Sequence, residues 1–148
     1  MADLSVLDPK AIQWAEEELQ VIAKSGLALD ETLLDLARRV GVQRPKLIRI
    51  ALVPSIPLPD DPALQAACAA VGFLSERLNG LTLGHGIYIR EGCATVRLLS
   101  HEFRHVYQYE QAGSIAGFLP EYLRQIFTVG HDQAPLEIDA RAHEIDNL

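Results

Sequence analysis

The chain has 148 residues, of which 49% are hydrophobic, and a formal net charge of −7. This length and composition are typical of one folded domain, spanning residues 1–148, with its own apolar core. The acidic balance argues against a nucleic-acid partner, because binding to phosphates needs clustered basic side chains. No apolar run approaches the roughly 18 residues that span a bilayer, which argues against a membrane protein.

The N-terminal segment and the cysteines indicate a cellular compartment. The first twenty residues contain no basic segment followed by an apolar run, so they do not form a signal peptide. We therefore expect a cytoplasmic protein, with export by a route that needs no signal peptide left open. The two cysteines, Cys68 and Cys93, belong to no Cys-x-x-Cys pair and are expected to be reduced thiols.

Taken in chain order, the predicted elements are mostly helices with two strands between them. Apolar periodicity predicts helices over residues 9–24, 30–40, 62–71, 94–111, 118–129 and 135–145, and strands over 46–53 and 81–89. A proline-rich segment ends the first strand, and the second strand has a Gly-His-Gly centre. We expect a small α+β domain with a mixed sheet, a helical N-terminal part and a C-terminal helix.

The predicted helix over residues 94–111 contains the stretch LLSHEFRHVYQYEQ. His101 and His105 are four residues apart and share one helical face, a spacing that suits two imidazoles on one tetrahedral zinc ion. Glu102 lies one step around the helix, where it can reach a metal-bound water without being a ligand. With five histidines and eleven glutamates in the chain, such a motif arises by chance about once in a hundred sequences. The alternative is a pair of core histidines, with Glu102 exposed or paired to Arg104.

A catalytic zinc site also needs a third protein ligand. Cys93 is too far, because the eight residues that separate it from His101 correspond to about 12 Å of helical rise. Glu137 is the favoured candidate. It lies near the start of a predicted helix after Pro135, and the small Ala140 one turn on permits close helix packing. The alternatives are Glu144, His143 and His131.

These segments together resemble the zincin metallopeptidases, in particular the gluzincin branch, in which the third zinc ligand is a glutamate. The likeness is to small bacterial domains found with toxin and contractile-injection-system cargo. Such domains show Thr-x-Gly-x-x-Ile-Tyr, then Leu-x-His-Glu-x-x-His-Val-x-Gln, and later Pro-x-Glu-x-x-Ala. Here the three motifs read TLGHGIY from residue 82, LSHEFRHVYQ from residue 99 and PLEIDA from residue 135. The resemblance covers residues 81–144.

The resemblance implies that His101, His105 and Glu137 hold Zn²⁺ and that Glu102 is the general base of a peptide hydrolase. It also implies that the predicted strand over residues 81–89 forms the sheet edge beside the central helix, where a peptide or protein substrate adds as an extra strand. The candidate substrate-binding residues are Gly84, His85, Gly86, Tyr122 and His131. Of these, Tyr122, His131 and His85 are also candidates for stabilising an oxyanion.

The competing interpretation is a non-catalytic module of the same fold that binds zinc structurally or binds a partner protein. A fold by itself does not establish chemistry. A zinc site closed by a fourth ligand, His131 or His143, would favour this module, whereas an open fourth position would favour the enzyme.

Overall fold

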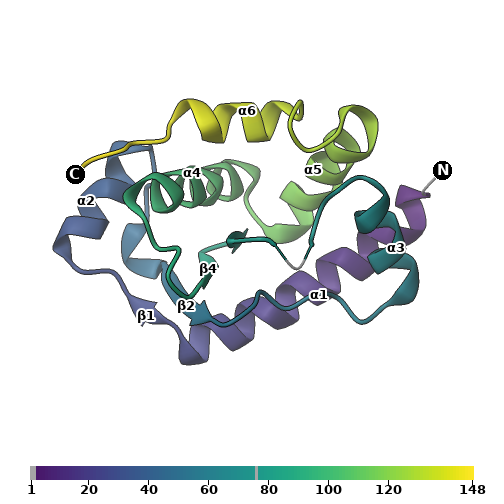
Figure 1. Ribbon diagram of the computed structural model, residues 1–148, viewed down its shortest axis with the longest axis horizontal. Coiled ribbons are helices and arrows are strands. Elements are labelled where there is room, and N and C mark those ends of the chain that lie inside the picture. The colour runs from purple at the N-terminus through teal and green to yellow at the C-terminus, as the bar shows by residue number, and fades with distance from the viewer. Residues whose placement is uncertain (1–2, 76) are drawn as a thin grey trace.

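A four-stranded sheet in the order β1-β2-β4-β3 lies at the centre of the computed structural model, which describes residues 3–75 and 77–148 (Figure 1). The strands are β1 (Leu27–Ala28), β2 (Arg49–Val53), β3 (Gly80–Leu83) and β4 (Gly86–Arg90). β2 and β4 are parallel, and the other two pairs are antiparallel. This mixed sheet, together with the helices around it, confirms the predicted α+β fold.

The helices lie on both faces of the sheet, with α1 along one side and α4 along the other (Figure 1). Their bounds are α1 (Leu4–Ser25), α2 (Glu31–Arg39), α3 (Pro62–Ala70), α4 (Val96–Ala112), α5 (Ile115–Val129) and α6 (Pro135–Ala142), with a short 3-10 turn η1 (Pro45–Leu47) before β2. α6 packs on the outer side of α4, and α5 contacts both α1 and α4. None of the helices in the described part of the chain combines the length and hydropathy of a membrane span.

The sheet separates two apolar cores. On one face Ile87 and Ile89 of β4 pack with Phe103 of α4 and with α2. On the other face Tyr88 of β4 packs in the core formed by α1, α3 and α5. β4 is therefore buried on both faces, which explains why its sequence is almost continuously apolar.

The predicted single strand over residues 81–89 is wrong, because β3 and β4 are the two arms of a hairpin. The chain reverses at Gly84, whose φ of +66° is readily reached only by glycine. The alternation of apolar residues continues through the turn, and this continuity hid the break. The correction matters for function, because of the two hairpin arms β3 lies at an edge of the sheet while β4 is paired on both sides.

Several helix ends also differ from the predictions. α1 begins at Leu4, where Asp3 caps it by accepting from the Ser5 N–H, so Pro9 lies inside the helix and does not start it. α6 ends at Ala142, three residues before the predicted end at residue 145, so Glu144 lies in the segment beyond the helix. The strand predicted over residues 46–53 is β2, which begins only at Arg49, after the 3-10 turn.

Candidate metal centre

α4 carries the histidine pair, and its position in the fold is well defined. Thr95 caps the helix by accepting from the Leu98 N–H, and Gly113 ends it in the left-handed conformation with φ of +92°. The apolar side chains of Leu99, Phe103 and Val106 bury one face against the sheet. The remaining face presents the two histidines, one helical turn apart, to α6.

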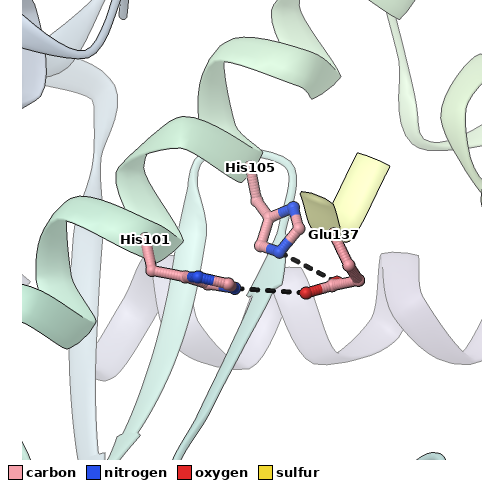
Figure 2. A group of neighbouring side chains, drawn as sticks. All are labelled: His101, His105 and Glu137. Atoms are coloured by element: carbon pink, nitrogen blue, oxygen red, sulfur yellow. Dashed lines mark hydrogen bonds and ion pairs between the residues drawn. The ribbon is translucent and has the colours of Figure 1, made fainter. Parts of the chain in front are cut away.

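The two imidazole rings converge on Glu137 in the first turn of α6, as Figure 2 shows. His101 Nε2 lies 3.2 Å from Glu137 Oε1, and His105 Nε2 lies 3.0 Å from Glu137 Oε2. One potential ligand atom from each residue falls within 4.8 Å of the other two. The structure thus brings together the three residues that the sequence proposed as ligands.

A polar network attaches α6 to α4 at this point. The Arg104 guanidinium donates to both carboxylate oxygens of Asp139, at 2.8 and 3.3 Å. The Gln108 amide donates to the Leu136 carbonyl and to Asp139, both at 2.9 Å. Ala140 is fully buried at the helix contact, as its small size allows. These contacts fix the direction in which Glu137 points.

The outer nitrogen of each histidine ring faces an acceptor. His101 Nδ1 lies 2.8 Å from Glu144 Oε2, and His105 Nδ1 lies 2.8 Å from Gln108 Oε1. A neutral imidazole carries one N–H, so donation from Nδ1 leaves a lone pair on Nε2. Both Nε2 lone pairs then point toward the Glu137 carboxylate, an arrangement that requires positive charge between them.

This donor set fits a zinc ion. Two imidazole nitrogens and one carboxylate oxygen are ordinary zinc ligands, and bonds of about 2.0–2.1 Å in a tetrahedral site place neighbouring ligand atoms about 3.3 Å apart. His101 Nε2 and His105 Nε2 lie 3.2 and 3.0 Å from different oxygens of Glu137, and one ligand atom from each of the three residues lies within 4.8 Å of the other two. In zinc sites the ring nitrogen that does not bind the metal usually donates a hydrogen bond to an acceptor, as Nδ1 of each histidine can here.

Without a metal ion, protons on His101 and His105 supply the positive charge. Burial lowers the pKa of His105, but the hydrogen bond and charge of Glu137 outweigh it and raise the pKa to about 9. The same opposing effects leave the pKa of His101 raised. Burial also opposes ionisation of Glu137, yet the two histidines hold the pKa of its carboxyl well below the usual range. Glu137 therefore stays ionised beside the two histidines.

Glu102 is buried, with 5% of its surface exposed, on the side of α4 that faces the edge strand. The Thr82 hydroxyl donates to Glu102 Oε1 at 2.8 Å. Glu102 Oε2 lies close under β3, where a Cβ added to Gly80 would come within 3.0 Å of it. The alternative in which Glu102 is exposed or paired with Arg104 is wrong, because Arg104 pairs with Asp139 instead.

Tyr122 and His131 lie beside the same cluster. The buried Tyr122 hydroxyl donates to Glu137 Oε2 at 2.7 Å, and burial together with the Glu137 charge raises the pKa of this hydroxyl well above its usual value. His131 is partly exposed, with Nε2 3.4 Å from Glu137 Oε1 and its ring stacked on Phe73. Tyr122 thus orients Glu137, while His131 faces it from the more open side.

The other residues that the sequence offered as candidates either lie away from the cluster or contact atoms other than the converging Nε2 atoms. Gly84 and His85 form the hairpin turn and Gly86 begins β4. Both glycines pack against α1, and none of the three residues is among the described residues that line the cavity beside the cluster. His143 Nδ1 donates to the Asp139 carbonyl at 2.8 Å. Glu144 faces Nδ1 of His101 and not the converging Nε2 atoms, so its place in the cluster differs from that of Glu137.

A cavity of about 260 Å³ opens beside the cluster. One end is polar and includes His101, Glu102, His105 and Glu137. The rest is lined by apolar side chains of α1, α3, α5 and β3 and of the segment between α3 and β3. A candidate metal centre, a buried carboxylate and an apolar cavity therefore meet at one place.

Sequence reasoning missed the contact of Glu102 with Thr82 and the close approach of Gly80. Thr82 belongs to a recognised motif, but its contact with a helix twenty residues away depends on how the hairpin folds. Gln108 contacts His105 directly, and Asp139 contacts Gln108.

Comparisons of the chain with models of known protein families, with curated protein sequences and with solved structures find no match.

Proposed function

We propose that the chain is a zinc-dependent metallopeptidase-like hydrolase. The observation that carries the proposal is the convergence of His101, His105 and Glu137 beside a cavity whose wall also contains the buried Glu102. Zinc in such a site lowers the pKa of a water molecule toward 7 and polarises a carbonyl oxygen.

Glu102 is suited to move the proton that hydrolysis requires. Its Oε1 atom is held by the Thr82 hydroxyl at 2.8 Å, while Oε2 lies under Gly80 at the cavity wall. We assign Glu102 as the general base that accepts a proton from the attacking water and then delivers it to the leaving amine. The hydrogen bond from Thr82 keeps the carboxylate in one orientation for both transfers.

The edge strand supports a peptide as the substrate. β3 is paired only with β4 among the described strands, so its other side can accept an extended peptide by strand addition. All four residues of β3 line the cavity. A peptide added to β3 would therefore run past Glu102 and the cluster.

His131 is the better candidate for stabilising an oxyanion. The Tyr122 hydroxyl already donates its hydrogen to Glu137, at 2.7 Å. His131 is partly exposed, lines the cavity and lies on the open side of Glu137. We propose that a ring N–H of His131 donates to the carbonyl oxygen as negative charge develops on it.

The substitution Glu102→Gln tests the proposed chemistry. It keeps the size and a hydrogen-bond acceptor for Thr82 but removes the proton acceptor, so we expect zinc content and fold to persist while hydrolysis of a peptide library falls below detection. Glu91→Gln, on an exposed residue, is the matched control and should keep full activity. Peptide hydrolysis that survives in Glu102→Gln would contradict the general-base assignment.

The second candidate is a non-catalytic module in which zinc is structural. The position of His131 Nε2, 3.4 Å from Glu137 Oε1, favours this alternative because His131 could serve as a fourth ligand. The enzyme and the structural module predict different effects of the substitution His131→Ala on zinc affinity and turnover. In the enzyme, zinc stays bound and turnover falls, whereas in the structural module zinc affinity falls sharply and the wild type has no turnover.

A further inference from the structure

The cavity extends from the polar cluster into the N-terminal half of the chain, which carries no recognised motif. Its far walls are formed by Ala11, Trp14 and Ala15 of α1 and by Leu64 and Cys68 of α3. These two helices lie outside residues 81–144, over which the chain resembles zincins. The N-terminal half thus contributes a surface to the candidate site and does not only complete the core.

The chemistry of the cavity changes from one end to the other. The ionisable side chains Glu102, Glu137 and Glu144 and the histidines lie at the cluster end. Among the described residues that line the far end, the only ionisable group is the thiol of Cys68, and burial raises its pKa to about 11, so it stays neutral. A charged side chain would find no counter-ion among these described lining residues, and its burial would be costly. The far end therefore suits an apolar group.

The volume of the cavity limits which apolar groups would fill it. A closed apolar cavity of roughly 150 Å³ is enough to bind benzene. The cavity here has about 260 Å³, and the cluster residues are part of its lining. It can accommodate an aromatic ring or a branched aliphatic side chain together with the chain atoms that carry it. A methyl group would leave most of it unfilled.

The edge strand determines how such a side chain would enter. Gly80, Leu81, Thr82 and Leu83 form the cavity wall nearest to Glu102. In a strand added beside them, successive side chains point to opposite sides. One side chain of the added peptide would enter the cavity, and its immediate neighbours would point away.

We propose that this cavity is the specificity pocket of the hydrolase and that it admits one large apolar side chain, aromatic or branched aliphatic, from a residue that flanks the cleaved bond. The inference rests on the proposed function. α1 and α3 then select the substrate, while α4 and α6 carry the chemistry. Because one methylene group in an apolar pocket changes kcat/KM by about 10–200-fold, phenylalanine or leucine at this position should be preferred over alanine by about 100-fold or more.

The chain contains its own reporter of occupancy, because its only tryptophan, Trp14, lies on the cavity wall. Trp14 fluorescence is recorded on the full chain, with and without zinc, during titration with toluene, N-acetyl-phenylalaninamide or N-acetyl-alaninamide. We expect a saturable change with the first two probes and none with the alanine derivative. This measurement requires neither zinc nor turnover.

A cavity-filling variant supplies the second arm of the test. Ala11→Phe places a ring on the cavity wall, whereas Val21→Phe places one on the half-exposed side of the same helix, where Val21 is 49% exposed. Ala11→Phe should abolish the fluorescence response and shift cleavage of a peptide library toward small residues, and Val21→Phe should change neither. If Ala11→Phe fails to fold, Ala11→Leu replaces it, with a reduced response expected.

The outcomes separate this inference from the proposed function. No saturable response to toluene or to the phenylalanine derivative overturns the pocket, whether or not peptides are cleaved. Cleavage without preference for large apolar residues also overturns it and leaves the hydrolase standing. A saturable response in a protein that cleaves no peptide supports the pocket as an apolar binding site and contradicts the proposed function instead.

Discussion

Glu110 and Glu137 both face histidines, and their surroundings differ. Glu110, near the end of α4, accepts the backbone N–H groups of Gln43 and Arg44 at 2.8 and 2.9 Å and contacts His85 Nε2 at 2.9 Å. Glu137 faces His101 and His105, with Tyr122 and His131 beside them. In the described part of the chain, the partners of the Glu137 carboxylate are three imidazoles and one phenol.

The difference shows what distinguishes a structural carboxylate from a candidate metal ligand. Backbone donors satisfy Glu110, so it joins α4 to the loop after α2 and to the hairpin turn without needing a cation. Glu137 is buried among ring nitrogens whose outer atoms already have acceptors. Its charge is balanced only if protons or a metal ion enter the cluster. A histidine next to a glutamate therefore does not by itself indicate a metal site. The hydrogen-bond partners of the other carboxylate oxygen and of the other ring nitrogen must also be known.

The largest expected effect follows from exchanging each glutamate for glutamine. Glu137→Gln should lower zinc affinity by about 1,000-fold, more than the 10–100-fold that is typical when a group behind a ligand is lost. Glu110→Gln should leave zinc affinity unchanged but lower the free energy of unfolding by about 1–3 kcal/mol, because one backbone N–H loses its acceptor. Competition with a chromophoric chelator and denaturant unfolding measure the two quantities. Equal zinc affinities in the two variants would contradict the assignment of Glu137, and not Glu110, as a zinc ligand.

The acceptor behind His101 should have the next largest effect. Glu144→Gln weakens the contact that orients Nδ1–H, so we expect a 10–100-fold loss of zinc affinity. Arg97→Ala is the matched control, because Arg97 pairs with Glu144 at 2.8 Å from an exposed position and does not contact the histidine. If the arginine variant loses as much zinc affinity as the glutamate variant, Glu144 acts through the local fold and not through His101.

A smaller effect is expected at the contact that holds the proposed general base. Thr82→Val removes the hydroxyl that donates to Glu102 at 2.8 Å, whereas Thr82→Ser retains it. A hydrogen bond to a charged group contributes about 1.5–3 kcal/mol, so kcat should fall about tenfold or more in the valine variant with zinc content unchanged. The serine variant should recover most of the rate. A valine variant as active as wild type would show that Thr82 does not position Glu102.

The smallest effect is expected at the other histidine. His85→Ala removes one of three partners of Glu110 at a partly exposed site, so the free energy of unfolding should fall by about 0.5–1.5 kcal/mol. Zinc affinity should be that of the wild type, because His85 lies at the hairpin turn. Chemical denaturation and zinc titration on the same preparation test both statements. Weakened zinc binding would mean that the two histidine–glutamate groups are coupled through α4.

Local patterns in the sequence predicted much of the fold and the candidate ligands. The helix with His101 and His105 follows from periodicity, and Pro135 marks the start of α6 with Glu137 in its first turn. The hairpin was not predictable, because the apolar alternation runs through Gly84 without a break. The contact of Thr82 with Glu102 and the approach of Glu144 from beyond α6 depend on tertiary packing, which leaves no periodic signal in the chain.

The central claim is that His101, His105 and Glu137 hold a zinc ion. The direct measurement is metal content by mass spectrometry on protein purified without added metal, for the wild type, a His101→Ala/His105→Ala double variant and the His85→Ala control. We predict about one zinc per chain in the wild type and in His85→Ala, and none in the double variant. A wild type that holds no zinc even after zinc is offered, or a double variant that keeps it, would contradict the claim.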